Sequence, residues 1–197
     1  MSNHKIRLAR AEDAKQVAEI YQEYVENPAA TLDLNPPTTE EMACRICTCG
    51  QFYPFLVCEV DGAVVAYAYA FRRFEEQAFD WGAFVSTYVS KSVGGRGIGR
   101  TLLDTLEEIM RAMGLVNMYS MVALSEKSKY FHLARGFSEV GRLREAAYKQ
   151  GKWRDLAYYE KNLALHDQDP AQVKSVQALD EDMLEKIFQN AEKLINL

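Results

Sequence analysis

The chain is predicted to fold as a mixed α+β (mixed α/β) structure, in which a central sheet of about seven strands carries helices on both faces. The main observation is the order of its segments: β-rich and amphipathic stretches follow one another as β-α-α-β-β-β-α-β-α-β-β. The length of 197 residues allows one well-buried core and is short for two ordinary domains. A hydrophobic content of 48% and a charged content of 26% are ordinary for a globular protein.

The first part of the chain predicts a strand, two helices and a hairpin. Residues 6–9 form a short β-rich run, and residues 10–27 place apolar side chains at helical spacing. Thr38 or Thr39 is expected to cap the second helix, because a glutamate follows in its first turn. Two β-rich runs then flank the Asp-Gly pair at residues 61–62, which predicts a hairpin.

The middle of the chain predicts the rest of the sheet. A β-rich run at residues 82–90 leads into a cluster of glycines, after which residues 100–114 have helical periodicity and end at a glycine. The remaining elements are a strand, a helix capped by Ser125 and a pair of antiparallel strands, at residues 115–124, 125–136 and 137–163.

The end of the chain has a different composition. Residues 166–177 form a polar linker that contains Pro170, and residues 179–197 carry apolar side chains on one helical face. We therefore divide the chain into a domain of residues 1–165 and a C-terminal extension of residues 166–197. The amphipathic helix of the extension is expected to dock on the body of the protein or on a partner chain.

Charge, hydropathy and cysteine spacing exclude several classes of function. The net charge of −5 offers no basic face for nucleic acid, and no apolar run is long enough to predict a membrane span. The N-terminal residues lack an apolar signal segment, which favours a cytoplasmic protein. Cys44, Cys47 and Cys49 lie close together, but structural zinc takes two separated pairs of ligands, so reduced thiols and no metal are expected.

The glycine-rich turn at residues 94–99, Gly-Gly-Arg-Gly-Ile-Gly, is the most informative segment. Consecutive glycines let several backbone N–H groups point the same way, and the helix that follows adds the positive end of its dipole. A phosphate group binds well in such a turn. The spacing is not that of the Rossmann motif, and the Walker sequence is absent. A purely structural turn remains the alternative.

This turn and its surroundings resemble the Gcn5-related N-acetyltransferase (GNAT) superfamily, and within it the phosphinothricin and methionine sulfone acetyltransferases. The stretches that carry the resemblance include "YPFLVCEVDGAVVAYAYA", "SVGGRGIGRTLLDTL" and "FHLARGFSEVGRLREAAYKQGKWRDLAYYEKNL", and the likeness spans residues 6–163. It implies the GNAT fold and an N-acetyltransferase that uses acetyl-CoA to acetylate the primary amine of a small, amino-acid-like molecule by direct transfer. It also implies a homodimer.

The resemblance further implies which residues bind the cofactor. Backbone amides of the glycine-rich turn are expected to hold the pyrophosphate of acetyl-CoA, and Val89 to bond the pantetheine arm as a neighbouring strand would. Ser125 replaces an asparagine that is usual near the pantetheine, and Ser128 matches a serine of the motif. The turn residues concerned are Gly94, Gly95, Arg96, Gly97, Ile98, Gly99 and Arg100. Gly94 replaces the arginine or glutamine that opens the family turn, which loosens the cradle unless Arg96 compensates.

His132, in the stretch "YFHLARGF", has two interpretations. Its apolar neighbours favour a packed helix residue. The resemblance instead implies a place beside the CoA sulfur, as proton donor to the leaving thiolate or as part of the substrate pocket. An ordinary histidine pKa of about 6.5 suits either proton transfer.

The acceptor side departs from the family pattern. Phe84 stands where the related enzymes carry a glutamate proposed as general base, so the amine is expected to lose its proton through water. Arg72 and Arg73, which are displaced along the sequence from the arginines of the family pattern, are candidates for binding an acidic substrate. Thr31 lies in a loop that the related enzymes use near the acceptor, and Lys149 lies in the most branch-specific stretch.

Two hypotheses from other classes stay open. Loss of the glutamate would leave an acetyl-CoA-binding protein with weak or no catalysis. Alternatively, the C-terminal helix would make the protein chiefly an assembly partner.

Overall fold

The computed structural model describes residues 3–27, 30–123 and 125–195, and its elements follow the predicted order. The strands are β1 (His4–Leu8), β2 (Phe55–Val60), β3 (Ala63–Arg72), β4 (Gly82–Val89), β5 (Asn117–Ala123), β6 (Ser138–Lys149) and β7 (Lys152–Asn162). The α-helices are α1 (Ala14–Val25), α2 (Thr39–Gly50), α3 (Ile98–Met113), α4 (Glu126–Leu133) and α5 (Glu181–Glu192).

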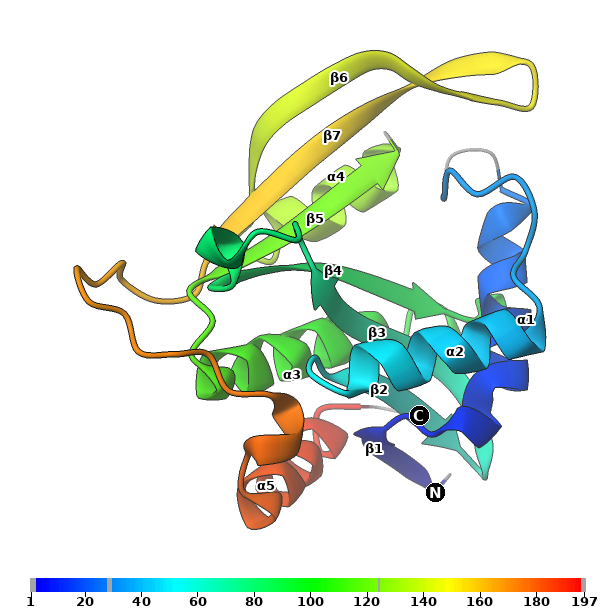
Figure 1. Ribbon diagram of the computed structural model, residues 1–197. Coiled ribbons are helices and arrows are strands. Elements are labelled where there is room, and N and C mark those ends of the chain that lie inside the picture. The colour runs from blue at the N-terminus through cyan, green and yellow to red at the C-terminus, as the bar shows by residue number, and fades with distance from the viewer. Residues whose placement is uncertain (1–2, 28–29, 124, 196–197) are drawn as a thin grey trace.

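All seven strands belong to one mixed sheet with the order β1-β2-β3-β4-β5-β7-β6 (Figure 1). Every neighbouring pair is antiparallel except β4 and β5, which are parallel. The parallel pairing covers only three rungs, from Gly82–Asn117 to Phe84–Tyr119. Beyond the Phe84–Tyr119 rung the two strands separate, so the second half of β4 has no strand on its β5 side (Figure 1).

Helices cover both faces of the sheet, as predicted. On one face, α1 and α2 enclose an aromatic core that includes Tyr67 and Tyr69. On the other face, α3 and α5 pack against a second core. Side chains of β4 alternate between the two faces: Ala83 and Val85 belong to the α3 core, whereas Phe84 contacts Phe71 on the α1/α2 face.

The local signals for turns and caps are confirmed. Thr38, not Thr39, caps α2: its hydroxyl accepts from the Glu41 N–H at 3.1 Å, and the Glu41 carboxylate accepts from the Thr38 N–H at 2.8 Å. Asp61 and Gly62 both have positive φ, at 49° and 84°, as a tight hairpin turn requires. Gly114 ends α3 in the left-handed conformation, with φ 91°.

The C-terminal helix α5 docks on the body of the protein itself. Its apolar face, which includes Ile187 and Phe188, is buried in the core beneath α3. Its last residue, Glu192, also serves the edge strand β1: the carboxylate accepts from the Ile6 N–H at 2.8 Å, and the carbonyl lies 2.8 Å from Nε2 of His4. A helix that covers an edge strand in this way protects it from pairing with another chain.

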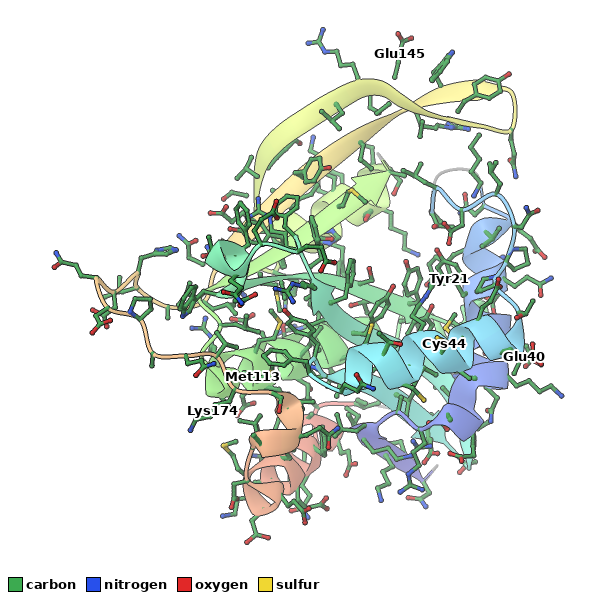
Figure 2. All side chains as sticks on the ribbon, in the orientation of Figure 1. Tyr21, Glu40, Cys44, Met113, Glu145 and Lys174 are labelled. Atoms are coloured by element: carbon green, nitrogen blue, oxygen red, sulfur yellow. The ribbon has the colours of Figure 1, made fainter. Side chains whose placement is uncertain are left out.

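The linker between β7 and α5 is held to the body by backbone hydrogen bonds. The Lys174 N–H donates to the Met113 carbonyl at 2.9 Å at the end of α3 (Figure 2), and the Val176 N–H donates to the Phe52 carbonyl at 2.8 Å. The extension is therefore part of the same packed structure as the sheet.

The four cysteines are free thiols, of which Cys58 is buried and Cys44 and Cys47 are exposed. Within the described ranges, no three His, Cys, Asp or Glu side chains group as metal ligands. None of the helices described is both long and apolar enough to cross a membrane.

Phe188→Ala is expected to lower the free energy of unfolding by about 3–5 kcal/mol, because it leaves a cavity between α5 and the sheet. Leu194→Ala is the matched control: Leu194 is 65% exposed, and its loss is expected to change stability by no more than about 0.5 kcal/mol. Urea unfolding measures both changes in the free energy of unfolding, provided that its dependence on urea concentration (the m-value) is the same in each variant. Equal effects of the two substitutions would contradict the docking of α5 on the body.

Candidate active site

The glycine-rich turn forms an open cradle at the carboxyl end of β4. Gly95 and Gly97 adopt left-handed conformations, with φ 84° and 80°, and Gly97 caps α3. The first N–H to bond back along α3 is that of Thr101, which donates to the Gly97 carbonyl at 3.0 Å. The preceding N–H groups of the first helical turn therefore lack helical partners and point outward beside the positive end of the helix dipole, where an anion binds well.

Gly99 lets the first turn of α3 lie directly against β4. A Cβ built at this position would lie 3.0 Å from Cγ2 of Val89, a tighter contact than side chains normally make. The glycine-rich turn is thus held close to the strand edge that separates from β5.

The arginines of the turn differ in their surroundings. Arg100 and Arg135 both face Asp104, with nitrogen–oxygen distances of 3.5 and 3.4 Å. Arg96 is exposed and forms no ion pair with any residue in the described part of the chain. It is therefore the turn side chain that is available to stand in for the arginine or glutamine replaced by Gly94.

The backbone of Val89 bonds a tyrosine hydroxyl. The Val89 N–H donates to the hydroxyl oxygen of Tyr24 at 2.8 Å, and the same hydroxyl donates to the Val89 carbonyl at 2.7 Å. Tyr24 comes from α1 and so fills, at this one residue, the place of a missing strand beside β4. A pantetheine arm that bonds Val89 must displace this hydroxyl.

Ser125 and Ser128 organise the start of α4, which follows β5. The Ser125 hydroxyl accepts from the Ser128 N–H at 3.2 Å and caps the helix. The Ser128 carbonyl in turn lies 2.8 Å from Nδ1 of His132. Since a carbonyl only accepts, Nδ1 carries a proton, and the helix cap and the histidine are linked by one chain of hydrogen bonds.

His132 is packed and yet keeps one nitrogen free. Its ring stacks on Tyr159 at a centroid distance of 5.3 Å, and Phe131 and Phe137 meet it edge-on. Burial lowers the pKa of His132, against the effect of its bond to the Ser128 carbonyl. The ring is therefore neutral near pH 7, with a lone pair on Nε2, which bonds no group in the described residues.

His132 and Phe84 lie on opposite faces of the sheet. Tyr159, on which His132 stacks, belongs to the core on the α3 face, whereas Phe84 contacts Phe71 on the α1/α2 face. A group that reaches His132 therefore cannot also rest on Phe84 unless it passes between β4 and β5. The gap between these strands connects two chemically different sides.

The side that carries Phe84 is lined by aromatic rings. Phe84 is 9% exposed and meets Phe71, Tyr119 and Tyr158 at centroid distances of 5.6, 6.2 and 6.4 Å. The carboxylate nearest by strand register is Glu160, which pairs with Tyr119 across β5 and β7. Sequence reasoning missed Glu160, because only the register of β7 brings it to this face.

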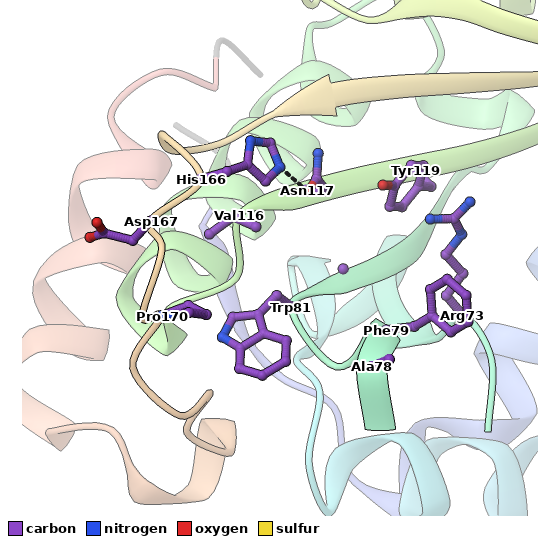
Figure 3. A pocket seen from close by; sticks show the side chains of 11 residues that line it. Arg73, Ala78, Phe79, Trp81, Val116, Asn117, Tyr119, His166, Asp167 and Pro170 are labelled. Atoms are coloured by element: carbon purple, nitrogen blue, oxygen red, sulfur yellow. Dashed lines mark hydrogen bonds between the residues drawn. The ribbon is translucent and has the colours of Figure 1, made fainter. Parts of the chain in front are cut away.

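The two arginines after β3 have different roles. Arg72 braces its own loop: its guanidinium donates to the carbonyls of Phe74 and Glu75 and to the Asp80 carboxylate, at 2.8, 3.0 and 2.8 Å. Arg73 instead lies flat on Tyr119, with its Cζ 3.8 Å from the ring centroid, and lines a pocket. Of the two, Arg72 is the more exposed but is paired with Asp80, whereas Arg73 is the one that lines the pocket (Figure 3).

Thr31 and Lys149 are brought into contact, although they are far apart in the sequence. Nζ of Lys149 donates to the Thr31 carbonyl at 2.8 Å, which joins the β6–β7 hairpin to the loop after α1. Burial lowers the pKa of Lys149, with Asp33 acting in the opposite sense. The Tyr21 hydroxyl lies 2.8 Å from Thr31 Oγ1 and donates to Asp33 at 2.6 Å, so this corner is a connected polar cluster.

Comparison with known proteins agrees with this geometry. The model of the acetyltransferase (GNAT) domain matches residues 6–157. Phosphinothricin N-acetyltransferase of Streptomyces viridochromogenes is 32% identical over 162 residues, which cover 82% of this chain and 88% of that protein. L-methionine sulfoximine/L-methionine sulfone acetyltransferase of Salmonella typhimurium is 30% identical over 165 residues, with 82% and 95% covered.

Among solved structures, the chain is similar to a GNAT superfamily phosphinothricin acetyltransferase from Sinorhizobium meliloti in complex with AcCoA. The TM-score is 0.80 at 32% identity, and the match covers 85% of this chain and 93% of that one. The whole C-terminal extension, residues 166–197, lies outside the domain match, which ends at residue 157.

Gly97→Ala is expected to weaken acetyl-CoA binding several-fold and to lower the melting temperature. A left-handed conformation costs an L-residue about 1–2 kcal/mol, and the turn relaxes by moving its N–H groups. Gly50→Ala, in α2, is the matched control, since no atom lies within 4 Å of the added Cβ. Calorimetric titration measures the affinity, and unchanged binding by Gly97→Ala would contradict the cradle.

His132 is expected to titrate below its ordinary pKa of about 6.5, as followed by the NMR shift of its ring C2 proton. Because the folded state then binds the proton less readily than the unfolded chain, the stability contributed by the neutral ring is complete above about 6.5 and is lost as pH falls from there through the lower pKa of the folded state. His132→Asn removes this part of the pH dependence. A midpoint above 6.5 would contradict the buried, neutral ring.

Proposed function

Because the chain belongs to the acetyltransferase (GNAT) family, we propose that it transfers the acetyl group of acetyl-CoA to the primary amine of a small, amino-acid-like molecule. The observation that carries the proposal is the separation of β4 from β5 directly beside the glycine-rich start of α3. The names of the two curated relatives, which act on phosphinothricin and on methionine sulfoximine or sulfone, support an amino-acid-like acceptor.

The cradle and the open strand edge suit the two ends of the cofactor. In the proposal, N–H groups between Gly95 and Arg100 hold the pyrophosphate, and Arg96 supplies the positive charge that Gly94 does not. The pantetheine arm replaces the Tyr24 hydroxyl as the hydrogen-bond partner of the Val89 backbone. Acetyl-CoA supplies the activated thioester, whose carbonyl the amine attacks.

In the proposal, the proton transfers at the amine nitrogen and at the CoA sulfur take place on different faces of the sheet. The amine approaches on the Phe84 side and must be neutral to attack; as the N–C bond forms and the C–S bond breaks, the nitrogen loses a proton and the sulfur gains one. A phenyl ring accepts no proton, so the amine proton leaves through water toward Glu160. This carboxylate lies on the same face, one rung across from Tyr119.

His132 serves the sulfur side in this proposal. Its neutral ring offers the Nε2 lone pair, while Nδ1–H stays bonded to the Ser128 carbonyl. Nε2 receives a solvent proton through water, which balances the proton that the amine releases to solvent, and passes it to the leaving thiolate, so that the ring returns to its neutral form and no net proton is consumed. Ser125 acts as a positioning residue, because its hydroxyl caps the first turn of α4, whose Ser128 carbonyl bonds Nδ1 of the His132 ring.

Assembly and location stay proposals. The β6–β7 hairpin exposes Val140, Leu143, Tyr148 and Trp153, which are 48–60% exposed and offer a surface for the homodimer implied by the family resemblance. The cytoplasmic location also stays a prediction. The apolar face of α5 is buried in its own chain, so it is not the surface that would carry an assembly.

The proposal is tested by ligand-linked stability and by thiol release. Acetyl-CoA at 100 times its Kd is expected to stabilise the protein by about 2.7 kcal/mol, and a panel of amino acids and their sulfone and phosphinic analogues to release CoA thiol. His132→Asn is expected to lower kcat by about 10²-fold or more at unchanged acetyl-CoA affinity. His4→Asn, in the edge strand β1, is the matched control and retains kcat.

Two outcomes would count against this account. Tight acetyl-CoA binding without thiol release on any amine would favour the alternative, a cofactor-binding protein whose catalysis was lost with the family glutamate that Phe84 replaces. Full activity of His132→Asn would reduce the histidine to a packing residue.

A further inference from the structure

The last turn of α1 lies against the end of β4, where Tyr24 holds the backbone of Val89 (Figure 1). One hydroxyl accepts from the Val89 N–H and donates to the Val89 carbonyl, at 2.8 and 2.7 Å. Both backbone groups at which the pantetheine arm is proposed to bind are therefore occupied by a single side chain of α1.

These backbone groups of Val89 face the gap between β4 and β5. The next residue, Ser90, bonds on the β3 side, where its N–H donates to the Val65 carbonyl at 2.9 Å. Successive residues of a strand direct their N–H and carbonyl groups to opposite sides, so those of Thr87 and Val89 point toward the gap. Since α1 covers the face that carries Phe84, the hydroxyl enters the gap from the side on which the amine is proposed to attack.

The end of α1 is fixed to β4 by further contacts, which do not involve the tyrosine hydroxyl. The Glu23 carboxylate accepts from the Ser90 hydroxyl at 2.9 Å and from the Lys91 N–H at 2.8 Å. The Tyr24 ring meets that of Tyr88 edge-on, at a centroid distance of 4.9 Å and an angle of 86°. The helix therefore stays attached when the hydroxyl gives up its two bonds to the strand, and the displaced hydroxyl stays beside the gap.

A displaced hydroxyl in this position needs a new acceptor, because a polar group that is withdrawn from water and bonds nothing is costly. Burial raises the pKa of Tyr24, and the nearby Glu23 carboxylate acts in the same sense, while the bond to the Val89 carbonyl acts against them. The hydroxyl therefore keeps its proton near pH 7 and is a donor. Among the acceptor atoms that the cofactor brings into the gap, the thioester oxygen is the one on which negative charge develops during the reaction.

We propose that Tyr24 is a catalytic residue, whose hydroxyl donates a hydrogen bond to the carbonyl oxygen of the acetyl thioester once the pantetheine arm has taken its place at Val89. The N–H of Thr87, which points into the same gap, is a second donor. The inference rests on the proposed function and adds to it the group that stabilises the negative charge on oxygen.

The hydroxyl acts without transferring its proton. As the amine nitrogen bonds the carbonyl carbon, the electron pair of the C=O π bond moves onto the oxygen, and the phenol hydrogen bond stabilises this oxyanion. The pair returns to re-form the C=O bond as the C–S bond breaks and the thiolate leaves. Tyr24 is thus unchanged at the end of the cycle, and its hydroxyl returns to Val89 when CoA is released.

The first test needs no acceptor amine. The protein is saturated with acetyl-CoA that carries ¹³C at the acetyl carbonyl, and the isotope-shifted C=O stretching band is measured by difference infrared spectroscopy. Hydrogen-bond donors lower this frequency, so the band of the bound cofactor is expected below that of acetyl-CoA in water. Tyr24→Phe keeps the ring and removes only the hydroxyl, and is expected to move the band to higher frequency. An unchanged band in Tyr24→Phe would overturn the proposal.

Tyr67→Phe is the matched control. Its ring lies in the same aromatic core and contacts Tyr88 at a centroid distance of 5.0 Å, but its hydroxyl is buried and bonds no group in the described residues. The control is expected to keep both the band and kcat. An equal shift in the two variants would show an effect of core packing and overturn the assignment.

Turnover and CoA binding give a second readout. Tyr24→Phe is expected to lower kcat by about 10²-fold or more, as the loss of an oxyanion donor does. CoA, which has no acetyl carbonyl, is expected to bind the variant at least as tightly as before, because a competitor for the Val89 backbone has been removed. Full kcat in Tyr24→Phe, or weaker CoA binding, would show that the hydroxyl serves only the structure and would overturn the proposal.

The outcomes separate this inference from the proposed function. Acetyl transfer with the same carbonyl band in Tyr24→Phe and in the unaltered protein refutes the inference and leaves the acetyltransferase intact. A band that depends on Tyr24, without transfer to any amine, supports the place of the hydroxyl and refutes the function. If Tyr24→Phe fails to fold, the band of the unaltered protein still decides, since a frequency at or above that of acetyl-CoA in water refutes the inference.

Discussion

The structure depends on how little of β4 and β5 is paired. Three parallel rungs hold the two strands together, and beyond Phe84 and Tyr119 each strand continues without the other. Backbone groups of β4 on that side need other partners, since unpaired polar groups are costly when buried. At Val89 the hydroxyl of Tyr24 meets this need. The opening between the strands, with the cradle at its end, follows from this limited pairing, and the opening is what connects the two faces of the sheet.

The alternation of side chains along the strands then assigns chemistry to each face. On the α3 face, the packing of Tyr159 keeps His132 buried and neutral, and the cap of α4 determines which ring nitrogen is free. On the other face, aromatic rings surround Phe84, which stands where the related enzymes carry a glutamate, and Arg73 and Glu160 lie beside Tyr119. Because the gap lies between two faces of different chemistry, the proposed mechanism assigns the proton transfers at nitrogen and at sulfur to different residues.

Much of the fold could be predicted from the sequence, because its signals are local. Hydrophobic periodicity gave the order of the elements, and Ser125, Gly114 and the Asp-Gly turn act within a few residues of their own position. The acceptor side could not be predicted, because it depends on contacts between distant segments. No sequence signal distinguishes Arg72, which braces its loop, from Arg73, which lies on Tyr119. Glu160 reaches this side only through strand register, and the Tyr24 hydroxyl reaches Val89 only because α1 packs against the end of β4.

The most direct test of this account is a crystal structure of the protein bound to acetyl-CoA. The account predicts that the pyrophosphate lies on the N–H groups of the turn between Gly95 and Arg100. It also predicts that the pantetheine arm occupies the gap between β4 and β5, bonded to Val89, with the Tyr24 hydroxyl displaced and the sulfur on the His132 side. Acetyl-CoA bound elsewhere, with the two bonds between Tyr24 and Val89 intact, would contradict it.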